Sequence, residues 1–408
     1  MKNDGGLNMN TNNDFTPLLR FPEYRTADSI WEKQKIGDIV KTIVPPKKLQ
    51  SNEFKKTGKY PIVDQSQKYI CGYSDDNLAL INGDANDLII FGDHTCILKF
   101  IDFPFIQGAD GIKIMVSSNP DKISTRFLFQ FLKAFPIESN EYKRHFSELK
   151  EKTVFYPKMI EEQYKIADCF FSIDSCLSSI NEKIEQLKAH KKSLMQKLFP
   201  QNGQTVPEYR FPEFRSSDEW NNKKMGDITV VVNRRNKSNR SLPIYSISNT
   251  DGFVPQSEQF DGLDSKSRGY DISLYKVVGR NTFAYNPARI NIGSFGYSGN
   301  LKEVLISSLY VCFKTTDEID DEFMICFLNT AHFRRAVESN VEGGIRSYLF
   351  YENFSRINII FPTIQEQRKI SSVIKSIDKL LFSNQRRVSL LEEQKKGLMQ
   401  KLFPSTSK

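Results

Sequence analysis

The sequence lacks the motifs of most enzymes that use nucleotides or metal ions. It contains no G-x-x-x-x-G-K-S/T phosphate-binding loop and no glycine-rich turn that follows a strand and opens a helix. We therefore expect this chain neither to hydrolyse ATP nor to bind S-adenosylmethionine. Its six cysteines form no C-x-x-C pair, which gives zinc or iron–sulfur ligation little support. The segment NPAR at residues 286–289 lacks the second proline and the aromatic residue of an N-P-P-aromatic methyltransferase motif, so a turn explains it better.

Long apolar runs are missing as well. No stretch of about 18 apolar residues could span a bilayer, and the start MKNDGGLNMN lacks the apolar core of a signal peptide. The four histidines, His94, His145, His190 and His332, have no partner at the spacing of a catalytic or metal site. We expect a soluble, cytoplasmic protein with no membrane contact, no active site and no metal of its own.

Composition allows several domains and suggests an acidic partner. At 408 residues with 39% hydrophobic side chains, the chain can form two or three domains, each with its own core. The formal net charge is +8, from 57 Lys and Arg against 49 Asp and Glu. Such a charge favours a nucleic acid as partner, but many soluble proteins carry it without binding one.

The sequence contains an internal duplication. KKSLMQKLFP at residues 191–200 returns as KKGLMQKLFP at residues 395–404, and RFPE at residues 20–23 returns at residues 210–213. A Gly-Asp-Ile triplet, a single tryptophan, a Gln-x-x-Lys-Ile pattern and a Ser-Ile-Asp triplet also recur in order. Residues 42–153 and 229–359 show no convincing match. We interpret the shared parts as scaffold and the unshared parts as the places where the copies do different things.

Each repeat ends in a predicted long helix. Apolar residues recur there in steps of four and three, which is typical of a coiled-coil seam, although a helix facing a globular core shows the same pattern over short lengths. The predicted seam consists of Ile173, Leu177, Ile180, Ile184, Leu187, Ile377, Leu381, Val388 and Leu391. Each helix would be roughly 54 Å long, so the second can bury its seam only by returning antiparallel to the first. Asn384 and Lys395 fall at seam positions, where polar groups help to fix the register.

The predicted fold class is α+β. Short β-branched runs separated by Gly, Asn and Asp indicate two mixed, mostly β domains, with helical stretches near residues 124–135 and 322–337. Two long antiparallel coiled-coil helices separate these domains, and an approximate twofold axis relates the copies. The predicted parts are a tail (1–15), a first mostly β domain (16–156), a central helical spacer (157–203), a second mostly β domain (204–361), a distal helical spacer (362–404) and a short tail (405–408).

Basic and amide side chains on irregular segments are the candidate binding residues. Arginine can bind guanine through two hydrogen bonds, glutamine and asparagine can bind adenine, and lysine binds phosphate. The candidates are Gln65, Gln67, Lys68, His94, Lys143 and Arg144 in the first copy, and Arg234, Arg235, Lys237, Arg268, Arg280, Asn286, Arg289 and Arg346 in the second. For any one of them, a solvated surface charge is the simpler interpretation; the prediction concerns them as a population.

The repeated segments resemble the DNA-specificity (S) subunits of Type I restriction-modification systems. The resemblance is carried by the doubled RFPE, Gly-Asp-Ile and LMQKLFP motifs and spans residues 18–404. YPIVDQSQKYICGY (residues 60–73), FGDHT (residues 91–95) and YNPARINIG (residues 285–293) look like recurrent pieces of target-recognition domains. The two copies differ in length, so residue roles are not carried from one to the other outside the shared blocks.

The resemblance implies a non-catalytic subunit within a larger complex. Each target-recognition domain would read one half of a split site in double-stranded DNA, and the helices would set the gap. Two modification subunits would supply methylation that depends on S-adenosylmethionine, and restriction subunits would use ATP and Mg²⁺; this chain would bind no cofactor. The alternative from a different class is a coiled-coil scaffold whose end domains bind other proteins.

Overall fold

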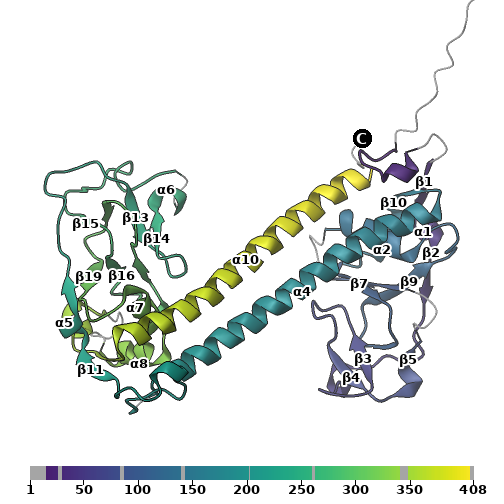
Figure 1. The fold of residues 1–408 in the computed structure, drawn as a ribbon. Coiled ribbons are helices and arrows are strands. Elements are labelled where there is room, and N and C mark those ends of the chain that lie inside the picture. Colours follow the sequence, from purple (N-terminus) through teal and green to yellow (C-terminus); the bar gives the residue numbers. More distant parts are fainter. Residues whose placement is uncertain are drawn as a thin grey trace, which may run out of the picture. The chain divides into compact units, whose positions relative to one another are not determined.

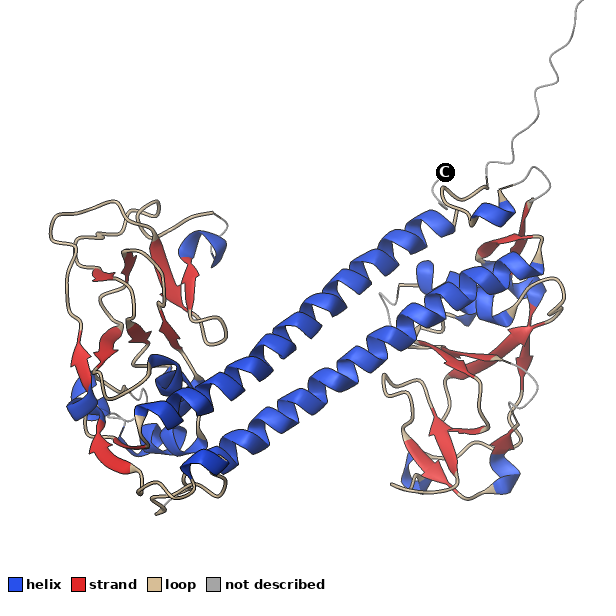
Figure 2. Cartoon of the chain, viewed as in Figure 1, coloured by secondary structure: helices blue, strands red, loops and turns tan. Residues whose placement is uncertain are grey.

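A computed structural model describes residues 15–25, 30–82, 87–138, 143–201, 203–259, 262–340 and 348–404. The chain forms two compact units. The first unit contains residues 1–181 and 386–408, and the second contains residues 182–385. Figures 1 and 2 show the elements of each unit.

Two four-stranded sheets and one two-stranded sheet form the β structure described in the first unit. One sheet is antiparallel, in the order β2 (Val40–Ile43), β9 (Ile112–Ser117), β6 (Leu88–Gly92) and β7 (Leu98–Ile101). The other has the order β4 (Gly72–Ser74), β3 (Tyr60–Val63), β8 (Phe105–Gln107) and β5 (Leu80–Ile81), with β3 parallel to β8. β1 (Trp31–Lys35) pairs with β10 (Thr153–Pro157). The short helices are α1 (Ile36–Ile39), α2 (Thr125–Ala134), α3 (Phe146–Glu151), η1 (Pro22–Tyr24), η2 (Ser51–Glu53) and η3 (Asn77–Ala79).

The second unit repeats this topology strand for strand. One sheet has the order β12 (Thr229–Val231), β19 (Val311–Thr315), β16 (Phe283–Tyr285) and β17 (Phe295–Tyr297). The other has the order β14 (Phe253–Pro255), β13 (Ile244–Ile247), β18 (Val304–Ile306) and β15 (Lys276–Val278), with β13 parallel to β18. β11 (Asn221–Lys224) pairs with β20 (Asn358–Phe361). The repeat therefore continues through the segments whose sequences show no match.

The short helices of the second unit differ from those of the first in several places, and the largest difference follows α7. They are α5 (Met225–Ile228), α6 (Gln256–Gln259), α7 (Asp321–Leu328), α8 (Ala331–Asn340), α9 (Tyr351–Phe354), η4 (Pro212–Phe214) and η5 (Ile290–Ile292). The helical stretch predicted near residues 322–337 is two helices, because the chain turns at Asn329 and Thr330. The Thr330 hydroxyl accepts from the Phe333 backbone N–H at 3.1 Å and so caps α8. Among the described residues, α8 has no counterpart in the first unit.

The long helices are α4 (Ile160–Leu198) and α10 (Ile364–Leu402), and their segments run antiparallel within each unit. In the first unit, Phe170 of α4 stacks on Phe403, just beyond α10, and Asp174 pairs with Lys395. In the second unit, Lys191 Nζ lies 2.5 Å from Asp378 Oδ1. Each lysine occupies the position where the apolar seam is interrupted, and each aspartate belongs to a Ser-Ile-Asp triplet. The repeated motifs therefore supply matching interhelical ion pairs.

All of the predicted seam residues are buried or half-buried. Ile180, Ile184 and Ile377 are buried, and the others are half-buried. Asn384, by contrast, does not bond across the helix pair in the described structure, because its Nδ2 donates to the Leu380 carbonyl oxygen of its own helix at 2.7 Å. Of the two polar seam positions, Lys395 is the one with a partner on the other helix.

A glutamine that recurs in both copies, Gln163 and Gln367, joins each long helix to its domain. The Gln163 side chain accepts from the Ser124 backbone N–H at 2.8 Å and donates to the carbonyl oxygen of Pro157 at 2.8 Å. Gln367 makes the same pair of bonds to Asp320 and Pro362. These buried side chains satisfy backbone groups beside the helix start, which explains why this glutamine recurs in both copies.

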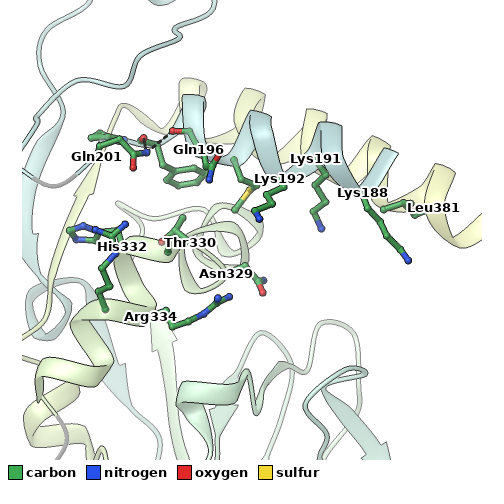
Figure 3. Close-up of a pocket in the computed structure, with 15 residues that line it drawn as sticks. Lys188, Lys191, Lys192, Gln196, Gln201, Asn329, Thr330, His332, Arg334 and Leu381 are labelled. Atoms are coloured by element: carbon green, nitrogen blue, oxygen red, sulfur yellow. Dashed lines mark hydrogen bonds between the residues drawn. The ribbon is translucent and has the colours of Figure 1, made fainter. Parts of the chain in front are cut away.

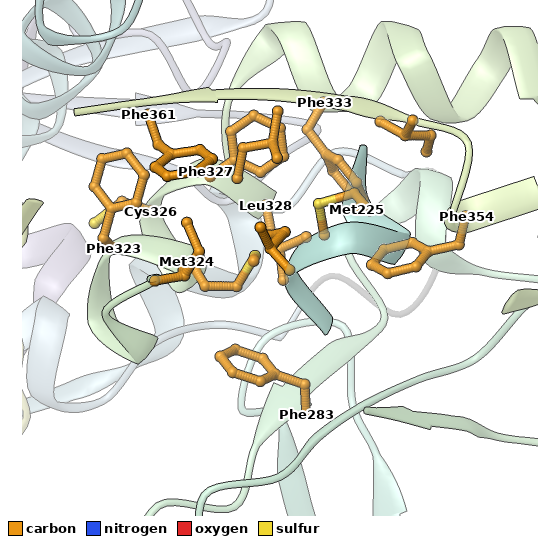
Figure 4. Close-up of a cluster of buried hydrophobic side chains, with 14 of the residues drawn as sticks. Met225, Phe283, Phe323, Met324, Cys326, Phe327, Leu328, Phe333, Phe354 and Phe361 are labelled. Carbon is orange, nitrogen blue, oxygen red and sulfur yellow. The ribbon is translucent and has the colours of Figure 1, made fainter. Parts of the chain in front are cut away.

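The arginine of RFPE also has a structural role in both copies. Arg20 donates to Glu162 from Nε at 2.9 Å, and Arg210 donates to Glu366 from Nε at 2.9 Å. Both pairs are almost fully buried. Each tryptophan packs edge-on against a helix phenylalanine, Trp31 on Phe127 and Trp220 on Phe323. Figure 4 shows the phenylalanine-rich core of the second unit.

Candidate nucleic-acid interface

Three segments that are distant in sequence meet at one end of the first unit's sheets. They are the loop after β3, the turn between β6 and β7, and the residues before α3. The Thr95 hydroxyl donates to the Gln65 carbonyl oxygen at 3.0 Å, and His94 Nδ1 lies 3.2 Å from the Lys143 carbonyl oxygen. We call residues 64–68, 93–96 and 143–145 the first rim.

The first rim contains every candidate residue that the sequence suggested for the first copy. The side chains of Gln67, Lys68, Lys143 and Arg144 are exposed, and His94 is half-buried. Gln65 differs, because its Oε1 is buried and has no hydrogen-bond partner among the described residues. A Cβ atom on Gly111, whose φ is +88°, would lie 2.6 Å from Gln65 Nε2. The Gln65 side chain therefore packs against Gly111, whereas the exposed cations and Gln67 face solvent.

Two buried charged residues that sequence reasoning missed hold the first rim in place. Lys99 is 4% exposed, and its Nζ donates to the carbonyl oxygens of Asp64 at 2.7 Å and Lys68 at 2.6 Å. Burial lowers the pKa of Lys99, and the nearby Asp64 carboxylate partly offsets this effect. Asp93, also 4% exposed, accepts from the Phe146 backbone N–H at 2.9 Å through Oδ1. The sequence signal for Lys99 was a charge within a strongly apolar segment, whereas Asp93 lies in the FGDHT segment (residues 91–95) that carries part of the resemblance.

An equivalent rim exists in the second unit. The turn between β16 and β17 corresponds to the turn between β6 and β7, and the Leu349 backbone N–H donates to the Pro287 carbonyl oxygen at 3.0 Å. The Ser294 hydroxyl donates to the Ile247 carbonyl oxygen at 3.2 Å, which holds this turn against the end of β13. We call residues 286–294 and 348–350 the second rim.

The second rim presents different side chains from the first. Arg289 is exposed on it, while Asn286 is half-buried and its Oδ1 accepts from the Ala288 backbone N–H at 3.0 Å. Asn286 therefore builds a turn, as the sequence indicated for NPAR. Arg346, the remaining candidate near this segment, lies outside the described residues.

Arg234, another candidate of the second copy, belongs to a separate group together with Arg240. Arg234 and Arg240 both pair with Glu303, and the Arg240 Nη1 to Glu303 Oε2 distance is 2.6 Å. Hydrogen bonds from Arg240 and Arg234 lower the pKa of Glu303. Sequence reasoning missed this carboxylate, which is far from both arginines along the chain.

Contacts extend this group toward the turn that contains Arg268. Lys266 Nζ donates to the Ser241 hydroxyl at 3.0 Å, which joins the turn containing Arg268 to the segment that contains Arg240. The Arg268 guanidinium lies over the Tyr270 ring at 5.4 Å. Arg235 and Lys237 are exposed, as is Arg280 in the turn between β15 and β16.

The described residues contain no group of three or more His, Cys, Asp and Glu side chains placed to hold a metal ion. No helix in the described part of the chain is long and apolar enough to cross a membrane. The surfaces brought together are basic and polar loops, whose hydrogen-bond donors suit phosphate oxygens and base edges.

Comparison with known proteins gives consistent matches across both halves. The family model of the Type I restriction modification DNA specificity domain matches residues 29–189 and again residues 217–393. The Type I restriction enzyme MjaVIII specificity subunit of Methanocaldococcus jannaschii is 22% identical over 271 residues, which cover 60% of this chain and 60% of that protein. The Type I restriction enzyme EcoR124I/EcoR124II specificity subunit of Escherichia coli is 25% identical over 107 residues, 26% of each chain.

A solved structure shares the fold over nearly the whole chain. The crystal structure of the S subunit of a Type I restriction-modification system from M. genitalium superposes with a TM-score of 0.66 at 17% identity. The superposition covers 96% of this chain and 100% of that one. The duplicated architecture is therefore found in a solved protein as well as in the sequence pattern.

Proposed function

Because the chain belongs to the family of Type I restriction modification DNA specificity domains, with one match in each half, we propose that it recognises DNA sequence as the specificity subunit of a restriction-modification complex. The observation that carries this proposal is the pair of rims. Both lie at the same place in one topology, both are built from loops, and they present different side chains. This is the arrangement expected of a conserved scaffold that carries two separate readers.

The two rims would read the two halves of a split, asymmetric site. Identical readers related by a twofold axis require a palindromic target, whereas diverged readers require two unlike half-sites. The first rim offers Gln67, Lys68, Lys143 and Arg144, and the second offers Arg289 among its described residues. The lysines and arginines would contact phosphates or guanine edges, and Gln67 would contact adenine.

The long helices would set the gap and dock the modification subunits. The same ion pair occurs in both copies and holds the antiparallel segments together, which favours a stiff spacer. Large apolar side chains remain exposed on α10, including Leu380, Phe382 and Leu390. Such residues on a helix already packed along one face provide apolar area for a further helix of a partner. We assign methylation and DNA cleavage to the partner subunits, with S-adenosylmethionine, ATP and Mg²⁺ bound there.

DNA binding at several salt concentrations tests this function. The full-length chain, alone and with its modification subunit, is titrated with duplex DNA of random sequence between about 50 and 200 mM NaCl, the range over which counterion release changes affinity strongly. A DNA reader gives a linear fall of log affinity with log salt concentration. A coiled-coil scaffold for other proteins gives no saturable DNA binding at any of these concentrations, and that result would overturn the proposal.

A further inference from the structure

The second unit contains a cationic cavity that none of the described residues of the second rim lines. The cavity has a volume of about 450 Å³ and lies between the carboxyl-terminal turns of α4 and the junction of α7 with α8. Lys188, Lys191 and Lys192 line it from α4, and Arg334 and Arg335 line it from α8 (Figure 3). No aspartate or glutamate is among its lining residues, and Met195 and Phe199 add apolar surface.

Most of this positive charge is not neutralised by neighbouring groups. Lys191 pairs with Asp378 at 2.5 Å, and Lys188 pairs with Glu185 at 2.8 Å. Within the described part of the chain, Lys192, Arg334 and Arg335 have no ion-pair partner. Lys188 and Lys192 are also one helical turn apart, a spacing at which like charges destabilise a helix. The cavity therefore concentrates cations at a cost that a bound anion would relieve.

The first unit provides an internal comparison, because it has the same cavity with a different charge. A cavity of about 470 Å³ is lined there by Lys395, Lys396 and Met399, the repeats of Lys191, Lys192 and Met195. Glu392 replaces Lys188, and no helix equivalent to α8 adds arginines in the described residues.

Carboxylates offset most of the lysine charge of that first cavity. Asp174 pairs with Lys395 and lies 3.0 Å from Lys133 Nζ. Three lysines therefore stand there against Glu392 and Asp174, whereas five cations stand in the second cavity against Asp378 and Glu185. The larger surplus of cations is a property of the second copy.

We propose that the cationic cavity binds a small ligand carrying several phosphate groups, of the nucleoside polyphosphate class. Lysine and arginine are the usual partners of phosphate. The volume of the cavity falls in the range of small-ligand sites. A cavity of this volume cannot enclose a DNA duplex, which could reach the cations only with its backbone phosphates. The apolar surface of Met195 and Phe199 suits the ring system of a nucleoside. This inference is independent of the DNA-reading function proposed above.

Isothermal titration of the full-length chain tests the inference. The probes are inorganic triphosphate and ATP without Mg²⁺, at an ionic strength held constant with NaCl. We expect saturable binding at one site. Lys192→Ala and Arg334→Ala should each weaken it by about tenfold, the loss typical of a hydrogen bond to a charged group. Lys396→Ala, which removes the equivalent lysine of the first cavity, should leave binding unchanged.

Several results would overturn the inference. They are the absence of saturable binding, an equal loss in Lys396→Ala, and displacement of triphosphate by duplex DNA together with weaker DNA binding by Lys192→Ala and Arg334→Ala. That last pattern would make the cavity a DNA-backbone contact. A second measurement needs no variant and so does not depend on variants folding. Triphosphate should raise the midpoint of thermal unfolding of the unmodified chain above that in NaCl of equal ionic strength, and an unchanged midpoint would count against the site.

Discussion

The backbone N–H of His145 donates a 2.8 Å hydrogen bond to the carbonyl oxygen of Asp93, and this bond joins two parts of the first rim. A backbone bond between the corresponding segments of the second unit joins Leu349, two residues before α9, to Pro287 at 3.0 Å. None of the four side chains is shared between the copies. The backbone therefore holds each rim in the same form, while the side chains on it are free to differ, as two readers of unlike half-sites require.

Replacing Arg144 should affect only the half-site read by the first unit. Its side chain is exposed on the first rim, next to Lys143 and His94. Arg144→Ala is expected to weaken DNA binding by about 1 to 3 kcal/mol if the guanidinium contacts a base, and to relax the preference at one position. Competition binding with sites altered in one half at a time measures this.

Two control variants sharpen that experiment. Lys150→Ala removes an exposed cation from α3, the helix that follows the first rim, and should leave affinity nearly unchanged. Arg289→Ala, on the second rim, should affect the other half-site instead. If Arg144→Ala weakened binding to both half-sites equally, the rims would not read separately.

Lys99 should act as a positioning residue for the first rim. Lys99→Met keeps a long apolar side chain but removes the donors to the Asp64 and Lys68 carbonyl oxygens. Unpaired buried acceptors cost about 1 to 3 kcal/mol each, so the free energy of unfolding should fall, and affinity for the first half-site should fall with it. Chemical denaturation and half-site binding measure the two effects. Lys41→Met, on the exposed edge strand of the same sheet, should change neither; a stable Lys99→Met variant with normal affinity would remove this role.

The buried pair between Arg20 and Glu162 should matter far more for stability than exposed pairs nearby. The two side chains are 8% and 1% exposed. Glu162→Ala removes the carboxylate that pairs with the buried Arg20 guanidinium and should lower the free energy of unfolding by about 3 to 5 kcal/mol. Lys165→Ala breaks the neighbouring exposed pair with Glu23 and should cost far less, because solvent screens an exposed pair. Urea unfolding of both variants decides this; similar losses would contradict it.

Lengthening both helices should widen the gap between half-sites. An insertion of seven residues after Ile184, with a matching insertion near Gln385 at the facing level of α10, keeps the apolar seam in register and adds about 10 Å. Along DNA this is roughly 3 base pairs at about 3.4 Å each. We expect the preferred half-sites to stay the same and the gap to grow, with weaker binding because the added rotation must be absorbed. Site selection measures both; an unchanged gap in a folded, DNA-binding variant would mean that the helices do not set the spacing.

Sequence alone predicted the helices and the duplication because these features have a strong local signal. Heptads repeated over many turns identify a helix pair, and the interrupted seam position at Lys395 pointed to a polar contact that the structure shows with Asp174. The structure also gives a reason for each recurring motif. Gln163, Gln367 and the paired arginines of RFPE join a domain to its helix, so their spacing is fixed by the scaffold.

The shared topology of the two domains could not be predicted in the same way. Many of the strands are only three residues long, too short to show an alternating pattern, and their pairing depends on backbone hydrogen bonds that almost any side chain permits. For the same reason the sequence did not show that Asp93 and Pro287 are equivalent. Glu303, which neutralises Arg234 and Arg240, is a contact across the fold and leaves no local signal.

Selection of binding sites from a randomised duplex pool, with the unmodified full-length chain and its modification subunit, tests the central claim most directly. Two different rims on one scaffold predict two unlike sequence blocks separated by a gap of fixed length in which no base is preferred. One continuous block, or a palindrome with identical halves, would contradict the claim that the two units read DNA independently.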